Sequence, residues 1–246
     1  MSAPRSYAQD LPRQAADLLD RVRTGSPRVH CLMNTVVQKL VADGLSAIGA
    51  VPSMTSSVEE VQAFVRKADA LVVNLGTLDA QRREAVGLAL DTAAEVEKPW
   101  VLDPAHCDYS PLRAAFAQEL LARGPAILRA NAAEHLLLEV PSDIVGVRTG
   151  EEDRIDLSAR TAMIGNGHPF MAKVTGTGCL SGAVIAAFVA IGDDRFIAAA
   201  SAMLVMGVAA EIAARTMRGP ASFGIELLDV LYRLSAQDIA QVARCR

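Results

Sequence analysis

A glycine-rich turn in the last third of the chain carries the clearest chemical signal in the sequence. Residues 173–179 read KVTGTGC, and an apolar helix is expected to follow directly over residues 180–190. Gly176 and Gly178 would let the backbone turn tightly and approach a ligand, and free N–H groups at the helix start would attract a phosphate. The turn lacks the Gly-Lys-Ser/Thr of a Walker A loop and the GxGxxG spacing of a dinucleotide fingerprint. It therefore indicates an anion site, with a plain strand-to-helix connector as the alternative.

Cys179 lies in the first turn of the expected helix. The helix dipole there should lower the pKa of the thiol from its usual value of about 8.5. The side chain could accept a proton from a substrate hydroxyl or only position that hydroxyl, and packing as a small buried residue is the alternative. The histidines are widely scattered, so we expect packing or surface roles for them. They are His30, His106, His135 and His168.

Short apolar segments alternate along the chain with longer amphipathic or Ala-rich segments. We expect strands over residues 28–32, 51–54, 70–75, 100–102, 126–129, 144–147 and 162–164. We expect helices over residues 11–22, 35–48, 58–67, 79–98 and 112–122, and three Ala-rich helices from residue 179 to the C-terminus. This alternation is typical of an α/β fold in which helices cover both faces of a mainly parallel sheet. It predicts a single domain over residues 1–246.

Polar residues follow several of these strands at the point where each one ends. They include Asn74, Asp103, Arg129, Asn131 and Thr149. In open parallel sheets, ligands bind outside the carboxyl ends of the strands. We therefore expect the functional site at this edge of the sheet.

The composition argues against several kinds of partner. The 246 residues carry a net charge of −4 and contain no basic run interleaved with aromatic residues, so we expect no nucleic-acid partner. The most apolar stretch, residues 196–210, is shorter than the roughly 20 residues that span a bilayer, so we expect a buried core helix and no membrane partner. The N-terminus is too polar for a signal peptide, and the four cysteines form no CxxC pair. We expect a cytoplasmic protein with free thiols.

Short motifs occur in a defined order along nearly the whole chain. They are HCLMN at residues 30–34, GAVPSM at 49–54, NLGTL at 74–78, LDP at 102–104, RANAAE at 129–134, TGE at 149–151, NGHP at 166–169, TGTGC at 175–179 and GPASF at 219–223. In this order they resemble the hydroxyethylthiazole kinase family of the ribokinase-like superfamily. TGTGC discriminates best, because most ribokinase-like enzymes have Asp where this turn has Cys179. The resemblance implies a ribokinase-like three-layer α/β/α fold with a mainly parallel central sheet.

The resemblance also implies which residues meet the acceptor substrate, a thiazole alcohol. Met54 would lie against the thiazole ring with Asn34 near it, and Gly176 would contact the same substrate. Cys179 would sit at the reacting hydroxyl. For Met54, a plain core position is the alternative.

A second set of implied roles concerns ATP and Mg²⁺. Arg129, Thr149 and Gly178 would hold the phosphates of ATP. Asp103 and Glu134 would face the Mg²⁺ ion, since a hard cation prefers carboxylate oxygens. For Arg129, a surface ion pair is the alternative.

The chain departs from the family pattern near residues 139–144. Family members carry a further helical segment there, whereas about a dozen residues separate Asn131 from Ile144. A parallel crossover needs about a dozen residues or more, so we expect the sheet to survive while one of its faces loses its cover. Residues 105–107, close to the expected phosphate site, also differ from the family pattern.

The resemblance predicts a kinase that phosphorylates 4-methyl-5-(2-hydroxyethyl)thiazole for thiamine synthesis. Two other functions remain open. A catalytically weakened paralogue that acts as a binding or regulatory protein is favoured by the shortened segment. An ADP-dependent NAD(P)H-hydrate dehydratase shares the general fold but has Asp in place of Cys179. The resemblance further implies a homotrimer with substrate pockets between subunits, and apolar surface left uncovered by the missing segment favours such an assembly.

Overall fold

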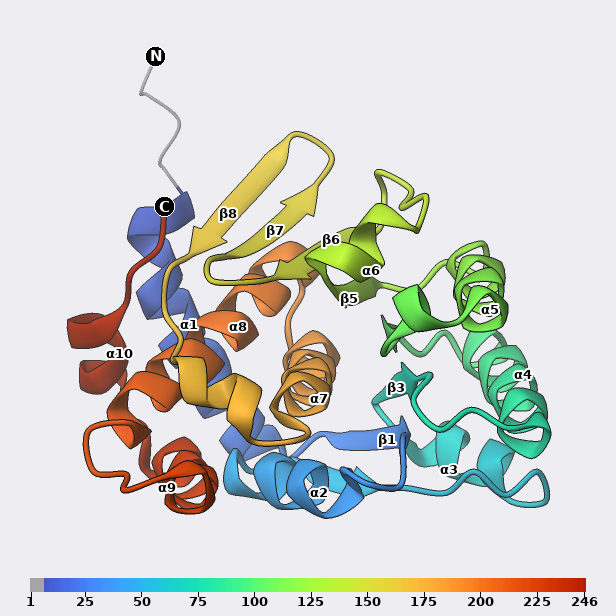
Figure 1. Cartoon of the computed structure of the whole chain (residues 1–246), viewed down its shortest axis with the longest axis horizontal. Coiled ribbons are helices and arrows are strands. Elements are labelled where there is room, and N and C mark those ends of the chain that lie inside the picture. Colours follow the sequence, from blue (N-terminus) through green and yellow to red (C-terminus); the bar gives the residue numbers. More distant parts are fainter. Residues whose placement is uncertain (1–6) are drawn as a thin grey trace.

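A mixed sheet of eight strands forms the centre of the computed structural model, which describes residues 7–246. The strands are β1 (Arg28–Leu32), β2 (Val51–Ser53), β3 (Ala70–Asn74), β4 (Trp100–Asp103), β5 (Ile127–Asn131), β6 (Val145–Thr149), β7 (Asp153–Leu157) and β8 (Arg160–Ile164). They lie in the order β2-β1-β3-β4-β5-β6-β7-β8 (Figure 1). Strands β1 to β6 pair in parallel, and β7 pairs antiparallel with both of its neighbours, β6 and β8. The predicted α/β fold with a mainly parallel sheet is confirmed.

Helices from different parts of the chain cover the two faces of the sheet. They are α1 (Tyr7–Gly25), α2 (Gln38–Ala47), α3 (Val61–Lys67), α4 (Ala80–Glu95), α5 (Pro111–Leu121), α6 (Ala132–Leu136), α7 (Thr177–Ile191), α8 (Arg195–Ala213), α9 (Pro220–Arg233) and α10 (Ala236–Val242), with 3-10 turns η1 (Cys107–Tyr109) and η2 (Pro169–Lys173). Helices α1, α2 and α7 to α10 share one apolar core with the sheet. Helices α3 to α5 share a second core with its other face (Figure 1).

The side chains of the buried strands divide between these two cores. In β3, all five residues are buried; Ala70 and Val72 belong to the core with α7, while Leu71 and Val73 belong to the core with α4. Successive side chains of a strand point to opposite faces, so an uninterrupted apolar run suits a strand covered on both sides. The sheet edge that carries the site is therefore held rigidly between two helix layers.

Helix α8 is long and apolar enough, by composition, to cross a membrane. In the fold, 83% of its most apolar window is buried. It packs against α1, α7 and α9 and belongs to the larger apolar core. The prediction of a buried core helix over residues 196–210 is confirmed.

Strand β7 and helices α6 and α10 were not predicted from the sequence. Strand β7 was not predicted, because only Ile155 of its five residues is buried; it forms a hairpin with β8 at the end of the sheet, where one face is open and the apolar signal is weak. The chain after Cys179 forms four helices instead of three. The additional helix, α10, begins where the Ser235 hydroxyl accepts a hydrogen bond from the Asp238 N–H, a local cap that the Ala-rich pattern does not reveal.

The shortened connection between β5 and β6 is the short helix α6. The prediction that one face of the sheet would lose its cover was wrong, because Leu128 and Ala130 of β5 stay fully buried. On β6, a Cβ atom at Gly146 would lie 3.2 Å from Nε2 of His135, so α6 packs directly onto that strand. Because Gly146 has no side chain to bury, the short helix α6 is enough to cover β6 at this point. The exposed apolar surface lies instead on α6 itself, at Leu136, which is 86% exposed.

We expect Gly146→Val to destabilise the fold by roughly 1–3 kcal/mol, because the new side chain would overpack the contact between β6 and His135. Urea unfolding measures this free energy. The matched control is Gly87→Ala in α4, where a Cβ atom meets nothing within 4 Å and helix propensity favours Ala by about 1 kcal/mol. Unchanged stability of Gly146→Val would contradict the close packing of α6.

Candidate active site

Three polar groups meet where β3 and β4 end and α7 begins. Asn74 and Asp103 are neighbours in the register of β3 and β4. The Asn74 amide donates a hydrogen bond of 2.7 Å to Asp103 Oδ2 and one of 3.3 Å to Cys179 Sγ. The Gly76 N–H donates to Asn74 Oδ1 at 3.0 Å, which fixes the orientation of the amide. The sequence placed Asn74 at a strand end and in the NLGTL motif but gave it no role, because its linking position depends on a contact across 105 residues.

The loop after β3 is held by a buried arginine that the sequence prediction did not single out. Arg82, in the first turn of α4, donates hydrogen bonds to the carbonyl oxygens of Asn74, Gly76 and Thr77. Burial lowers the pKa of its guanidinium from the ordinary value. Because three backbone carbonyls share one planar cation, the loop that carries Asn74 is held against α4.

Arg129, in the middle of β5, lies between the carboxylate of Asp103 and the start of α7. Its Nη1 is 3.9 Å from Asp103 Oδ1, and its Nη2 donates to Thr149 Oγ1 at 3.3 Å. A Cβ atom at Gly178 would come within 2.8 Å of Arg129 Nη2, so only glycine allows this approach without displacement. Arg129 Nε is buried without a partner among the described residues. Arg129 is therefore largely buried beside Asp103, so its predicted alternative as a surface ion pair was wrong, while its role toward ATP stays a prediction.

A cavity of about 270 Å³ opens beside Arg129. Its lining residues are Arg129, Thr149, Asp153, Asn166, Gly167, Met171, Ala172, Thr177, Gly178, Ser181, Met203, Met206 and Gly207. One part presents a guanidinium and the N–H groups of a helix start, which suit phosphate, and the methionines supply an apolar part. Burial raises the pKa of the Asp153 carboxyl to about 6, and this carboxyl accepts a hydrogen bond from the Gly150 N–H. Asp153 was not predicted, since it begins the unpredicted strand β7.

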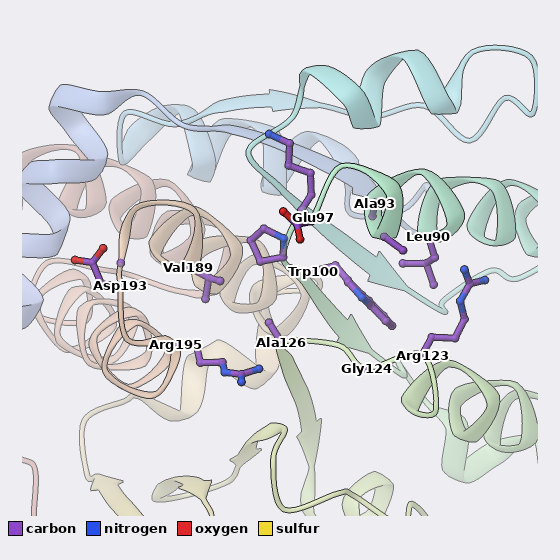
Figure 2. Close-up of a pocket in the computed structure, with 14 residues that line it drawn as sticks. Leu90, Ala93, Glu97, Trp100, Arg123, Gly124, Ala126, Val189, Asp193 and Arg195 are labelled. Carbon is purple, nitrogen blue, oxygen red and sulfur yellow. The ribbon is translucent and has the colours of Figure 1, made fainter.

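A larger cavity, of about 450 Å³, lies at the opposite edge of the sheet. Figure 2 shows Trp100 and Ala126 at the amino ends of β4 and β5, with Arg195 of α8 nearby. None of the predicted site residues lines this cavity. Ligands of open parallel sheets bind at the carboxyl ends of the strands, so the smaller cavity beside Arg129 is the candidate site.

Carboxylates that could bind a cation follow β4 and β5. Glu134 is buried, and its two carboxylate oxygens accept hydrogen bonds from the N–H groups of His106 and Asn131, at 2.7 and 2.8 Å. Ligand atoms of Glu134, His106 and Asp108 lie within 4.8 Å of one another. Asp108 Oδ1 is buried without a partner among the described residues. This donor set, rich in oxygen, fits a hard divalent cation.

The second predicted metal ligand, Asp103, has a different environment. Its Oδ2 accepts from Asn74, and its Oδ1 accepts from the Ala105 N–H at 3.2 Å. Each of these oxygens keeps a further lone pair, so cation binding stays compatible with the observed contacts. The structure thus places Asp103 with Asn74 and Arg129, and Glu134 with His106 and Asp108.

The expected acidic thiol at Cys179 was wrong. Burial, and after it the negative charge of Asp103, raises the pKa of the Cys179 thiol to about 12. Arg129 and the Asn74 amide act in the opposite direction, but more weakly. The thiol is therefore protonated at neutral pH, which favours a positioning role over a thiolate base.

The three predicted substrate residues also lie at the carboxyl ends of the strands, on the side of the sheet where β2 is the outermost strand. Asn34 Oδ1 accepts from the Val36 N–H at 2.8 Å, and its side chain packs against Gly76. Gly176 is the N-cap of α7 with φ +100, and a Cβ there would meet Val37 at 2.9 Å. Met54 directly follows the edge strand β2 and packs partly buried against the larger core. Asn34 and Gly176 thus flank α2, while Met54 lies further along the edge, beyond β1.

A profile of the Hydroxyethylthiazole kinase family matches residues 19–142 and 138–237 of this chain. The chain belongs to the hydroxyethylthiazole kinase family. A probable hydroxyethylthiazole kinase from Agrobacterium fabrum is 55% identical over 231 residues, which are 94% of each chain. A solved structure of a hydroxyethylthiazole kinase protein from Pyrococcus horikoshii OT3 is 34% identical and matches with a TM-score of 0.92, over 95% of this chain and 98% of that one. A ribokinase-like superfamily protein from Enterococcus faecalis shares the fold, with 15% identity, a TM-score of 0.64 and coverage of 90% and 95%.

The family and the ribokinase-like fold predicted from the motif order are thereby confirmed. The two parts of the family match overlap at residues 138–142. This junction lies within the connection between α6 and β6, where the sequence is shorter than the family pattern. The hydroxyethylthiazole kinase fold is therefore retained around a shortened crossover.

We expect Arg129→Ala to weaken binding of a non-hydrolysable ATP analogue by about 1.5–3 kcal/mol, because it removes a charge-assisted contact to phosphate. Gly178→Ala should have a similar effect, since its Cβ atom would displace the same guanidinium. Affinity for the thiazole alcohol should change far less. Isothermal titration calorimetry measures both affinities, with Gly87→Ala as the control. Unchanged nucleotide affinity in Arg129→Ala would contradict the assignment.

Proposed function

We propose that this protein transfers the γ-phosphoryl group of ATP to the hydroxyethyl group of 4-methyl-5-(2-hydroxyethyl)thiazole, as one kinase domain acting in the cytoplasm. Family membership supports this reaction. The observation that carries it is the Asn74 amide, which donates hydrogen bonds to both Cys179 and Asp103 beside the cavity that Arg129 lines. A phosphate donor and an alcohol acceptor can meet at this junction.

In this proposal, the cavity beside Arg129 binds the nucleotide. Arg129, Thr149 and the N–H group of Gly178 bind the phosphates, and the methionines that line the cavity contact the base. Phosphoryl transfer depends chiefly on positioning and on neutralisation of charge. Arg129 serves both needs, because Thr149 orients its guanidinium and Gly178 lets it reach the start of α7.

Mg²⁺ would be held by Glu134 and Asp103, with the unpartnered oxygen of Asp108 next to Glu134 as a further donor. When bound, the ion would neutralise phosphate charge during transfer. The hydrogen bonds from the N–H groups of His106 and Asn131 orient the Glu134 carboxylate. Removal of that carboxylate would release the turn after β4 and would also remove a metal ligand.

The acceptor alcohol would bind at Cys179, with Asn34 and Gly176 on one side and Met54 over the thiazole ring. The protonated thiol positions the hydroxyl rather than deprotonating it strongly. A loose transition state needs little help from a base, so this arrangement can support turnover. The hydroxyl proton would then leave late, toward an oxygen of the transferred phosphoryl group, and the rate would depend on how the thiol positions the hydroxyl.

A homotrimer with interfacial sites forms part of the proposal. Met54 follows the edge strand β2, and Val51 of that strand is 46% exposed. Val36, two residues beyond Asn34, is 71% exposed. A neighbouring subunit that covers this edge would bury apolar side chains and complete the wall of the substrate pocket.

Static light scattering at micromolar concentration should give three times the 26.0 kDa of one chain, because the edge near Met54 requires a partner. Replacing Val36 and Val51 together with Lys should dissociate the assembly and raise the KM for the alcohol. Gly87→Ala should leave both unchanged. A stable monomer with full thiazole kinase activity would contradict the interfacial site.

Cys179→Ser should lower kcat at least tenfold and up to about a hundredfold with nucleotide affinity retained, since a misplacement of about 1 Å at the reacting atoms can cost about 10²-fold. Cys179→Asp should match or exceed the wild-type kcat, because a carboxylate accepts a proton more readily than a thiol with a pKa of about 12. The variant should also gain an acidic limb in its profile of rate against pH. A coupled ATPase assay with the thiazole alcohol measures both. A folded Asp variant that binds both ligands and has no activity would refute the role of Cys179.

A further inference from the structure

His30 is a fully buried histidine whose two ring nitrogens both have partners on the segment that carries Met54. It lies in β1, in register with Ser53 of β2. Its Nδ1 is 2.9 Å from Ser53 Oγ, and its Nε2 is 3.2 Å from the carbonyl oxygen of Thr55. One imidazole ring thus holds the residues on both sides of Met54.

These two contacts define the tautomer of the ring. A carbonyl oxygen only accepts, so Nε2 carries the proton and donates it to Thr55. Nδ1 then has a free lone pair and accepts the hydrogen bond of the Ser53 hydroxyl. Burial lowers the pKa of His30 to about 4, which keeps the ring neutral at physiological pH and preserves both bonds.

The backbone at Met54 has few other constraints. Strand β2 has three residues at the edge of the sheet, and its pairing with β1 ends at His30 and Ser53. Thr55 is also tied by its hydroxyl to Glu60, at 2.6 Å, and Glu60 is the charged group that acts on the His30 ring. The ring of Phe64 packs against the imidazole with centroids 5.5 Å apart. His30 therefore holds the backbone of residues 53–55 in place beyond the last pair of the β1–β2 ladder.

We propose that His30 is a positioning residue that fixes the backbone on both sides of Met54 and thereby determines the affinity for the acceptor alcohol. This inference rests on the proposed function, in which Met54 contacts the thiazole ring. His30 is far along the sheet edge from Arg129, separated by β3 and β4. Its effect should therefore fall on the alcohol and not on ATP.

The test compares steady-state constants for both substrates in the full-length protein. His30→Leu leaves the Thr55 carbonyl and the Ser53 hydroxyl without their partner, and we expect the KM for the thiazole alcohol to rise about tenfold or more. The KM for ATP should stay within about twofold. His30→Gln should recover most of the loss, because its amide nitrogen can reach the place of Nε2 and donate to Thr55.

A double-mutant cycle separates positioning from general damage. If His30 acts through Met54, His30→Leu should have little further effect on the alcohol KM in a Met54→Ala background. Additive effects of the two substitutions, or a parallel rise in the KM values of both substrates, would overturn the inference.

Ser53→Ala provides a milder variant that keeps the test decisive if His30→Leu does not fold. It removes only the donor to Nδ1, and we expect the alcohol KM to rise about threefold to tenfold. Its matched control is Ser201→Ala, at a buried serine of α8 whose hydroxyl has no partner among the described residues. Equal KM values in the two serine variants would refute the role of His30. A wild-type protein without thiazole kinase activity would overturn the proposed function together with the inference, whereas an active wild type with unselective variants would overturn the inference alone.

Discussion

Burial of the Asp103 carboxylate is the constraint on which the rest of the site depends. A carboxylate that is 1% exposed has lost its hydration, which costs several kcal/mol unless charges and hydrogen bonds compensate. The Asn74 amide and the nearby Arg129 guanidinium provide this compensation. Arg129 can approach only because position 178 has no side chain, and Gly182 lies one turn further along α7, near the same carboxylate. The glycines of α7 thus shape the turn and also leave room for the charges that stabilise the Asp103 carboxylate.

The pKa of the Cys179 thiol depends on two opposing effects, the helix dipole and burial, and the larger of them prevails. A helix dipole stabilises a charge near its N-terminus by about 0.3–1 kcal/mol at the surface. Burial beside Asp103 acts in the other direction and raises the pKa of the thiol to about 12. Each pKa unit corresponds to about 1.4 kcal/mol, so burial outweighs the dipole. The same low-dielectric site that strengthens the contacts of Asp103 therefore keeps its neighbouring thiol protonated.

The shortened crossover shows how a local deletion can be absorbed by a fold. A parallel connection must return the chain to the same end of the sheet, and α6 does so in one short helix. Gly146 makes this possible, since α6 can pack directly onto β6 without a side chain between them. Glu134 then links α6 to the turn after β4 through its buried carboxylate. The short connection therefore still carries a buried carboxylate that holds the turn after β4.

The sequence by itself determined seven of the eight strands, the mainly parallel sheet and the sheet edge where the candidate site lies, because apolar runs and glycine-rich turns are local patterns. Motif order also identified Arg129, Thr149 and Gly178, which the structure brings to one cavity. The tertiary structure alone decided that Asn74 links Asp103 to Cys179, that the thiol is protonated, and that β7 extends the sheet with Asp153 at the cavity. Each of these features depends on burial or on contacts between residues far apart in the chain. Burial and long-range contacts of this kind leave no local periodic signal in the sequence. Sequence patterns therefore establish which groups lie at the carboxyl ends of the strands, and tertiary packing decides their protonation states and their partners.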